Sequence, residues 1–314
     1  MSAIRIGTSG WSYPEGVGTW NGVFYPAPSR ARGRGTFDEL AYYAERFDTV
    51  EVNSSFYRTP SPQTTRSWAR RTPRAFEFSM KLFQKFTHPK MFRESTGVED
   101  ARPTRDDVDA FKACLDPLAA DRKLGALLAQ FPPSFDRTDA HCDYLAWLLE
   151  TFEEHPLAVE LRHRTWSDRR VETESLLTSH GAAWVQIDEP KFRFSVRQDF
   201  VPNVDGLYYL RLHGRNAAQW WTHEHAEDRY NYLYSREELE PVEEIVDAVG
   251  HLVKKLYLYF NNHFAAKAVA NAVMLKKDLG LAVGGTYPAA FVEAYPALRG
   301  VVATSASQAS GTLF

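Results

Sequence analysis

The chain has 314 residues, of which 44% are hydrophobic and 25% are charged, and this composition is typical of a globular protein. It excludes a disordered chain, a collagen and a small disulfide-bonded scaffold. The net charge of −3 excludes the strong overall positive field of a general nucleic-acid binder, although a local basic patch is compatible with it.

The N-terminal sequence and the cysteines indicate the compartment. Residues 1–7 contain no apolar segment of signal-peptide length, and no apolar run of the chain is long enough to cross a membrane. Cys114 and Cys142 match neither a metal-ligand spacing nor a disulfide framework, so we interpret them as reduced packing residues. We therefore expect a cytoplasmic protein with no membrane partner.

Eight short apolar segments are predicted to be β-strands, and segments with helical periodicity separate them. In chain order the strands are residues 4–7, 49–53, 76–81, 125–130, 158–162, 183–188, 207–213 and 255–261. Residues typical of helix starts are Ser61 before Pro62, Thr104 with Asp107, Ser167, and Ser235 with Glu238. The helix after the eighth strand is expected over residues 265–279, ending at Gly280.

This alternation favours a parallel sheet covered by helices, and its simplest form is a single (β/α)8 TIM-type barrel. We expect residues 1–300 to form the barrel domain and residues 301–314 a flexible C-terminal tail. A doubly wound open sheet is the alternative, but residues 7–10 lack the spacing of a dinucleotide-binding loop. The long strand-to-helix loops at 82–103, 189–204 and 214–234 are expected to bind ligands.

Polar residues occupy alternate positions near the C-terminal ends of most predicted strands. Alternate side chains of a strand share a face, so these residues should point into the barrel, at the end where barrel active sites lie. They are Glu51, Asn53, Lys81, Gln130, Glu160, Arg162, Gln186, Asp188, Arg211, His213 and Asn261. An internal network of ion pairs without a ligand would explain the same pattern, but buried pairs stabilise a fold poorly, which favours a functional site.

Several longer motifs resemble the YecE-like family, which is catalogued only as a domain of unknown function. They are IGTSGWSY (6–13), TVEVNSSFYR (49–58), QFPPSF (130–135), ELRHRTW (160–166), RLHG (211–214), RYNYLY (229–234) and FNN (260–262). The resemblance implies a TIM-type barrel and supplies no reaction. After the FNN motif the family usually carries a glycine before the helix, whereas this chain has His263-Phe264-Ala265-Ala266-Lys267.

The strand-end residues suggest two kinds of chemistry. His213 is the candidate general base, with Glu160 or Asp188 to orient it, and Glu51 is a further candidate catalytic residue. Basic side chains near the start of the last helix, which Asn262 precedes, are candidates for binding phosphate or another oxyanion. The predicted ligand-binding residues are Lys81, Arg162, Arg211, Arg215, Asn53, Gln130, Asn261, Asn262 and the aromatic residues Trp11, Tyr57 and Trp166.

A metal site is the third candidate. Glu160, Asp188 and His213 resemble the ligand order of the sugar-isomerase and endonuclease IV-like barrels. Those barrels usually offer a glutamate where this chain has Asn261, and the adjacent arginines would repel a dication. We therefore expect neither a metal nor a cofactor.

The predicted function is that of an enzyme acting on a phosphate-bearing, nucleic-acid-derived ligand by acid–base or hydrolytic chemistry. A carbohydrate isomerase or epimerase acting on an unphosphorylated sugar is one alternative, and a non-catalytic ligand- or nucleic-acid-binding barrel is another. Residues 308–314 (QASGTLF) resemble the clamp-binding peptides of bacterial replication and repair proteins, although Gly311 stands where a leucine is preferred. A sliding clamp is therefore a candidate partner of the tail, and an inert tail is the alternative.

Overall fold

The computed structural model describes residues 2–27, 37–220 and 226–304. The predicted strands are confirmed to within one or two residues, except that the sixth is split in two at Val185. They are β1 (Ala3–Thr8), β2 (Thr49–Val52), β3 (Glu77–Lys81), β4 (Leu124–Gln130), β5 (Leu157–Glu160), β6 (Ala183–Trp184), β7 (Gln186–Asp188), β8 (Leu207–Leu212) and β9 (Lys255–Phe260).

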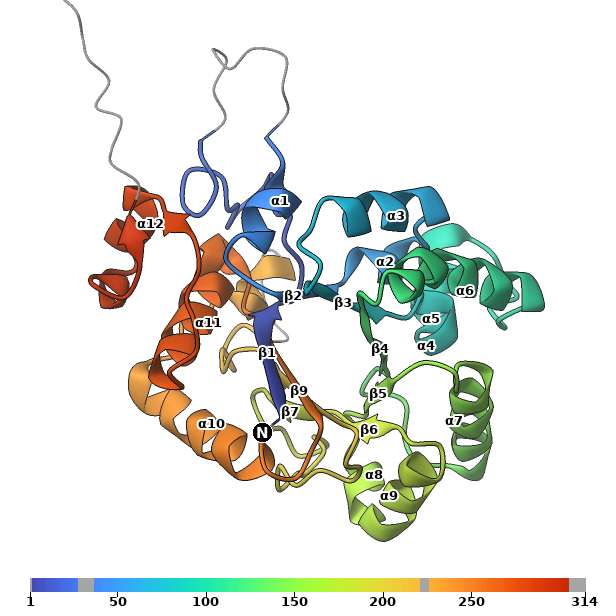
Figure 1. The fold of residues 1–314 in the computed structure, drawn as a ribbon. Coiled ribbons are helices and arrows are strands. Elements are labelled where there is room, and N and C mark those ends of the chain that lie inside the picture. Colours follow the sequence, from blue (N-terminus) through green and yellow to red (C-terminus); the bar gives the residue numbers. More distant parts are fainter. Residues whose placement is uncertain (1, 28–36, 221–225, 305–314) are drawn as a thin grey trace, which may run out of the picture.

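These strands form two parallel sheets whose order is that of a barrel. One sheet has the order β7-β8-β9-β1 and the other β2-β3-β4-β5-β6. A parallel bridge between Ser9 and Glu51 links β1 to β2. Gly7 permits this approach, because a Cβ atom there would lie 2.4 Å from the carbonyl oxygen of Thr49. Helices surround the strands, so the α/β class with parallel sheets is confirmed (Figure 1).

The ladder is interrupted between β5 and β7, where residues 194–198 are inserted. The Val196 N–H donates to the Arg162 carbonyl at 2.8 Å, and Ser195 forms an antiparallel bridge with His163. The Gln198 amide donates to the Val185 carbonyl at 2.7 Å and accepts from the Ile187 N–H at 3.0 Å. The long loop after β7 therefore supplies the hydrogen bonds that a continuous strand pair would otherwise make.

Most of the helix N-caps expected from the sequence are present in the structure. Ser61 caps α3, and the predicted capping boxes are present at Thr104 for α6 and Ser235 for α10. Ser167 does not cap a helix; it lies inside α8 and its hydroxyl donates to the Arg164 carbonyl. The helices around the strands are α1 (Glu39–Ala44), α2 (Ser54–Tyr57), α3 (Pro62–Arg70), α4 (Gln84–Thr87), α5 (Pro89–Thr96), α6 (Arg105–Ala120), α7 (Asp139–Thr151), α8 (Arg164–Asp168), α9 (Arg170–Ser179), α10 (Arg236–Val249) and α11 (Lys267–Asp278). Within the described ranges, no helix has the length and apolar character needed to cross a membrane.

The start of α11 differs from the expected position. The helix begins at Lys267 rather than at Ala265, after a short 3-10 turn over Phe264–Ala266. Ala265 and Ala266 have φ values of +52° and +65°, in the left-handed region that glycine tolerates best. The chain therefore places two alanines at the point where the family usually carries a glycine.

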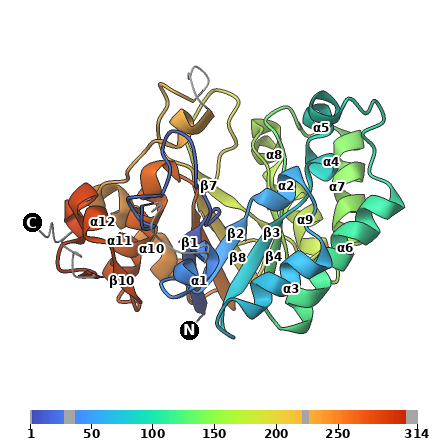
Figure 2. The ribbon, with the colours of Figure 1, turned by 90° about the horizontal axis from the view of Figure 1, so that it is seen from above.

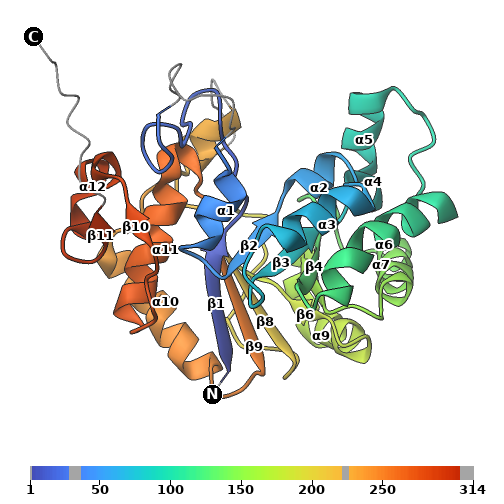
Figure 3. The same ribbon diagram turned by 45° about the horizontal axis from the view of Figure 1, so that its top comes forward.

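The C-terminal segment adds a small outer layer. β10 (Thr286–Tyr287) pairs with β11 (Ala303–Thr304), and these elements lie with α12 (Ala289–Ala294) on the outer side of α11 (Figure 3). Residues 301–304, expected to belong to a flexible tail, are part of this layer. The rest of the predicted tail, residues 305–314, lies outside the described residues.

Large tyrosines fill the barrel interior against small residues on the opposite strands. Tyr259 of β9 contacts Thr49 Oγ1 at 2.6 Å and Ser79 Oγ at 2.9 Å through its hydroxyl. A Cβ atom on Gly125 would lie 2.8 Å from the hydroxyl of Tyr257. These tyrosines are buried and precede Arg211 and Asn261 along β8 and β9, so this tyrosine layer lies on the N-terminal side of those residues. The strand-to-helix connections lie at the other end, away from the N-terminus (Figure 2).

Candidate active site

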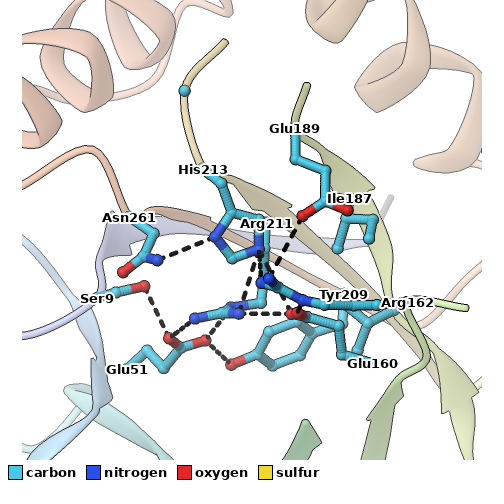
Figure 4. Close-up of polar contacts among 12 residues, drawn as sticks. Ser9, Glu51, Glu160, Arg162, Ile187, Glu189, Tyr209, Arg211, His213 and Asn261 are labelled. Carbon is cyan, nitrogen blue, oxygen red and sulfur yellow. Dashed lines mark hydrogen bonds and ion pairs between the residues drawn. The ribbon is translucent and has the colours of Figure 1, made fainter. Parts of the chain in front are cut away.

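A buried ion-pair network lies above the tyrosine layer, at the C-terminal ends of the strands (Figure 4). Arg211 of β8 is at its centre. Its guanidinium donates to both carboxylate oxygens of Glu51, from Nε at 2.9 Å and from Nη2 at 2.7 Å, and it donates to Glu160 from Nη1. Ser9 and Tyr209 complete the shell of Glu51 by donating their hydroxyls at 2.7 Å each.

The network continues through Arg162, which follows β5. Its Nε donates to Glu160 at 2.7 Å, and its Nη1 lies 3.5 Å from Glu189. Burial would raise the pKa of Glu160, but Arg211 and then Arg162 outweigh it and hold this pKa well below its usual range. Burial raises the pKa of Glu189. Both guanidinium groups are thus neutralised by protein carboxylates.

His213 is held neutral by the same arginines. Its Nε2 lies 3.2 Å from Nη2 of Arg162 and 3.3 Å from Nη1 of Arg211, and both of these groups are donors. Nε2 must therefore be an acceptor, so Nδ1 carries the proton in the neutral ring. The Asn261 amide nitrogen lies 2.9 Å from Nδ1, so this amide must turn its oxygen toward the ring to accept that proton. Burial and then Arg211 lower the pKa of His213 to about 3. A ring with both nitrogens engaged and a pKa this low is poorly suited to be the predicted general base.

A cavity of about 440 Å³ opens beside the network. Seven of the predicted site residues line it, with Tyr13, Tyr230 and His263 among the other lining residues. The predicted residues in the lining are Lys81, Arg211, Asn53, Gln130, Asn261 and the pair Trp11 and Tyr57 from the aromatic set. This volume suits a small ligand.

Lys81, at the end of β3, differs from the arginines because it is not paired. Its Nζ lies 4.1 Å from the centre of the Phe56 ring, and among the described residues it forms no hydrogen bond or ion pair. Burial and then Arg211 lower the pKa of Lys81 to about 7. The cavity therefore holds an amine that is partly unprotonated at neutral pH and free to contact a ligand.

Sequence reasoning missed two side chains of the site. Glu189 follows directly after β7 and was assigned to a loop. His263 follows the FNN motif; it stacks on Tyr13 with ring centres 4.4 Å apart and lies 4.9 Å from Tyr230. Burial lowers the pKa of His263 to about 4, so the ring is neutral. Its place just beyond the eighth predicted strand was the available signal.

Four predicted site residues lie elsewhere. Asp188 points away from the network and pairs with Arg215 at 2.9 Å and Tyr234 at 2.7 Å, which also removes Arg215 from the cavity. Ile187 takes the inward position that the alternation had assigned to Asp188 (Figure 4).

Trp166 is fully buried, and its indole donates to the Phe135 carbonyl at 2.8 Å. Asn262 also has a structural position, because its amide nitrogen donates to the Tyr232 carbonyl and to the Asn271 side-chain oxygen. Because Asp188 is turned away, Glu160, Asp188 and His213 do not converge. Among the residues that the structure describes, no three His, Cys, Asp or Glu side chains are grouped to hold a metal ion.

Comparison with known proteins finds relatives that match most of this chain and nearly all of their own length. Residues 5–293 match the family described as "Protein of unknown function DUF72". The UPF0759 protein YunF of Bacillus subtilis is 26% identical over 296 residues, covering 91% of this chain and 98% of the relative. A solved DUF72 family protein of Thermotoga maritima is 33% identical with a TM-score of 0.73, covering 88% of this chain and 99% of its own. Another, from Enterococcus faecalis, is 25% identical with a TM-score of 0.74, covering 89% and 96%.

Proposed function

The chain belongs to the DUF72 family of proteins of unknown function, and we propose that it is an enzyme acting on a small ligand with an anionic oxygen group. A phosphate-bearing, nucleic-acid-derived compound is the class expected from the sequence. The chemistry is acid–base chemistry at Lys81, in the cavity formed by the C-terminal ends of the strands.

The observation that carries this proposal is the contrast between Lys81 and the two arginines beside it. Arg162 and Arg211 have protein carboxylates as partners, whereas Lys81 has none among the described residues. Lys81 is half-buried, and an amine without a protein partner at the wall of a cavity supports a role toward a ligand. As an ammonium it would bind the oxyanion, and as an amine it would accept a proton.

Arg211 supports the same ligand class with one further donor. A guanidinium has five N–H groups, and the contacts with Glu51, Glu160 and His213 use four of them. The remaining N–H is on Nη2, and Arg211 is among the residues that line the cavity. One fixed donor and one mobile amine would together hold an oxyanion.

Thermal unfolding with and without inorganic phosphate, sulfate and adenosine monophosphate tests the proposal. A ligand that binds the folded state raises the melting temperature by mass action. We expect a rise for the wild-type protein, most of it retained in Lys81→Arg and lost in Lys81→Met. Arg215→Gln, which changes an arginine outside the cavity, is the control and should retain the rise.

The melting temperature of Lys81→Met without ligand checks that the variant is folded. It should equal or exceed that of the wild type, because removing an unpaired buried amine removes a desolvation cost. Equal ligand-induced shifts in wild type and Lys81→Met, or none at millimolar concentrations, would contradict the anionic ligand. Binding without turnover of any phosphate ester would instead favour the non-catalytic alternative.

A further inference from the structure

We propose that the ligand of this cavity carries an aldehyde or ketone group next to a hydroxyl, and that Lys81 captures the carbonyl carbon as an imine. This inference rests on the proposed function only in placing the ligand beside Lys81. It does not require the ligand to carry a phosphate.

The surroundings of Lys81 are those of a reactive amine rather than a structural one. The hydroxyl of Ser55 fixes its backbone by donating to the Lys81 carbonyl at 2.6 Å, so the side chain starts from a rigid strand end. The amine then lies against the Phe56 ring and faces the cavity. Proteins usually activate a lysine nucleophile by placing its amine in an apolar environment or next to another cation.

Other buried lysines of the same chain provide the comparison. Lys123 donates to the carbonyls of Ala69 and Thr72 at 2.6 and 2.7 Å and to a hydroxyl. Lys85 pairs with Asp107 at 2.7 Å. These two ammonium groups thus have hydrogen-bonding partners in the protein, whereas Lys81 has none among the described residues.

The charged groups facing Lys81 act in both directions. Arg211 and Arg162 disfavour the ammonium form, whereas Glu160 and Glu51 favour it. Burial adds to the effect of the arginines, and His88 on the same side is neutral because burial and then Lys81 lower its pKa to about 3. The free amine is consequently a major form at neutral pH, as attack on a carbonyl requires.

The reaction balances without a further reactant. The nitrogen lone pair of Lys81 attacks the carbonyl carbon, and the electron pair of the C=O bond moves to oxygen, which takes a proton. The carbinolamine then loses this oxygen as water, the nitrogen gives up its second proton, and a C=N bond forms. No oxidation or reduction takes place.

Asn53 identifies the neighbouring hydroxyl of the ligand. Asn53 lines the cavity, and its side-chain oxygen is buried and has no hydrogen-bond partner among the described residues. A buried acceptor without a donor is costly, and a ligand hydroxyl would satisfy it. Gln130 and Asn261 offer further amides, and Trp11 and Tyr13 supply aromatic walls of the kind that pack against sugars. Short hydroxyaldehydes and hydroxyketones fit this set.

Reductive trapping tests the proposal on the wild-type protein. The protein is incubated near neutral pH with dihydroxyacetone or glyceraldehyde and cyanoborohydride, and the peptides are analysed by mass spectrometry. The expected product is Lys81 with an added mass equal to the probe less one oxygen. At about pH 7 an ordinary exposed lysine is unprotonated in only about one molecule in 2,500, whereas Lys81 is unprotonated in about half. Because a less basic amine is also a weaker nucleophile, Lys81 should react about a hundredfold faster than Lys90 on the surface of α5.

Variants separate the parts of the proposal. Lys81→Arg should lose the adduct and Lys90→Met should keep it. Asn53→Ala should react with dihydroxyacetone about tenfold more slowly but with formaldehyde, which has no hydroxyl, at the wild-type rate. Labelling of Lys81 no faster than that of Lys90 would overturn the imine, and equal effects of Asn53→Ala on both probes would overturn the hydroxyl contact. If Lys81 is trapped as an adduct but phosphate does not raise the melting temperature, the phosphate-bearing ligand is contradicted and the imine is not.

Discussion

The guanidinium of Arg211 and the carboxylate of Glu51 form a bidentate pair, with Nε and Nη2 of the arginine each donating to a different oxygen at 2.9 and 2.7 Å. The two residues come from strands on different sheets, β8 and β2, and both are fully buried. The pair therefore ties the two sheets together across the interior. It also directs most of the Arg211 donors to protein, whereas Lys81 has no hydrogen bond or ion pair within the described part of the chain.

Arg211→Lys should destabilise the protein strongly. An ammonium cannot reproduce the planar two-point contact with Glu51 while it also reaches Glu160, and a broken buried pair costs about 3 kcal/mol. Unfolding in urea measures the free energy. Arg215→Lys is the matched control, since it changes a half-exposed pair with Asp188 worth at most about 1 kcal/mol. Similar losses in both variants would contradict the assignment.

Acid should destabilise the protein partly through His213. The pKa is about 3 in the folded state and about 6.5 in an unfolded chain, so between these values the unfolded state binds the extra proton. Stability is then lost as the pH falls below about 6.5, by up to about 1.4 kcal/mol per pH unit for each such group. Urea unfolding between about pH 7 and pH 5 should show a smaller slope in His213→Gln, whose amide oxygen still accepts from the arginines.

The surface substitution His251→Gln is the control for that experiment and should retain the wild-type slope. His263, His88 and His155, whose pKa values are also lowered, contribute to the slope that remains in His213→Gln. An unchanged slope in His213→Gln would show that this ring is not held neutral by the two guanidinium groups.

Ala265→Gly should stabilise the protein by about 0.5–1 kcal/mol. Ala265 has a φ of +52°, a conformation that costs an alanine about 1–2 kcal/mol. Glycine avoids this cost, but its greater flexibility stabilises the unfolded chain and offsets part of the gain. Thermal or urea unfolding measures the change. Ala270→Gly, inside α11, should lose about 1 kcal/mol or more, and a loss at both positions would contradict the strain at Ala265.

The tail is a separate proposal, because residues 305–314 lie outside the described part of the chain. A peptide of these residues should bind a bacterial sliding clamp with micromolar affinity, since segments that fold on binding spend part of the interaction energy on ordering. Calorimetric titration measures this, with Leu313 and Phe314 replaced by alanine in the control peptide. No binding at about 100 µM, about 5.5 kcal/mol, would remove this link to DNA metabolism.

The strand positions and much of the site were predictable because a barrel repeats one simple rule. Alternation along β2, β5 and β8 correctly directs Glu51, Glu160 and Arg211 inward, and the network follows from that. The rule failed at Asp188, because residues 194–198 are inserted beside β7 and Ile187 takes the inward position. An insertion from a long loop has no periodic signal in the sequence.

The sequence does not show which basic residues form ion pairs with carboxylates. Lys81, Arg162 and Arg211 look equivalent as basic strand-end residues, and only the geometry shows that carboxylates occupy the two arginines. Trp166 shows the same difficulty, because a tryptophan just after a strand can line a cavity or, as here, pack against Phe135. Which contact forms depends on neighbours that are distant in the sequence.

The most direct test of the central claim, that Lys81 is a free and reactive amine, is a measurement of its pKa in the intact protein. Trace labelling with fluorodinitrobenzene over a range of pH, quantified for each lysine peptide, gives this value. We expect half-maximal reactivity of Lys81 near pH 7, whereas an ordinary lysine would require about pH 10.4. A Lys81 titration near about pH 10.4, or a side chain that does not react until the protein unfolds, would contradict it.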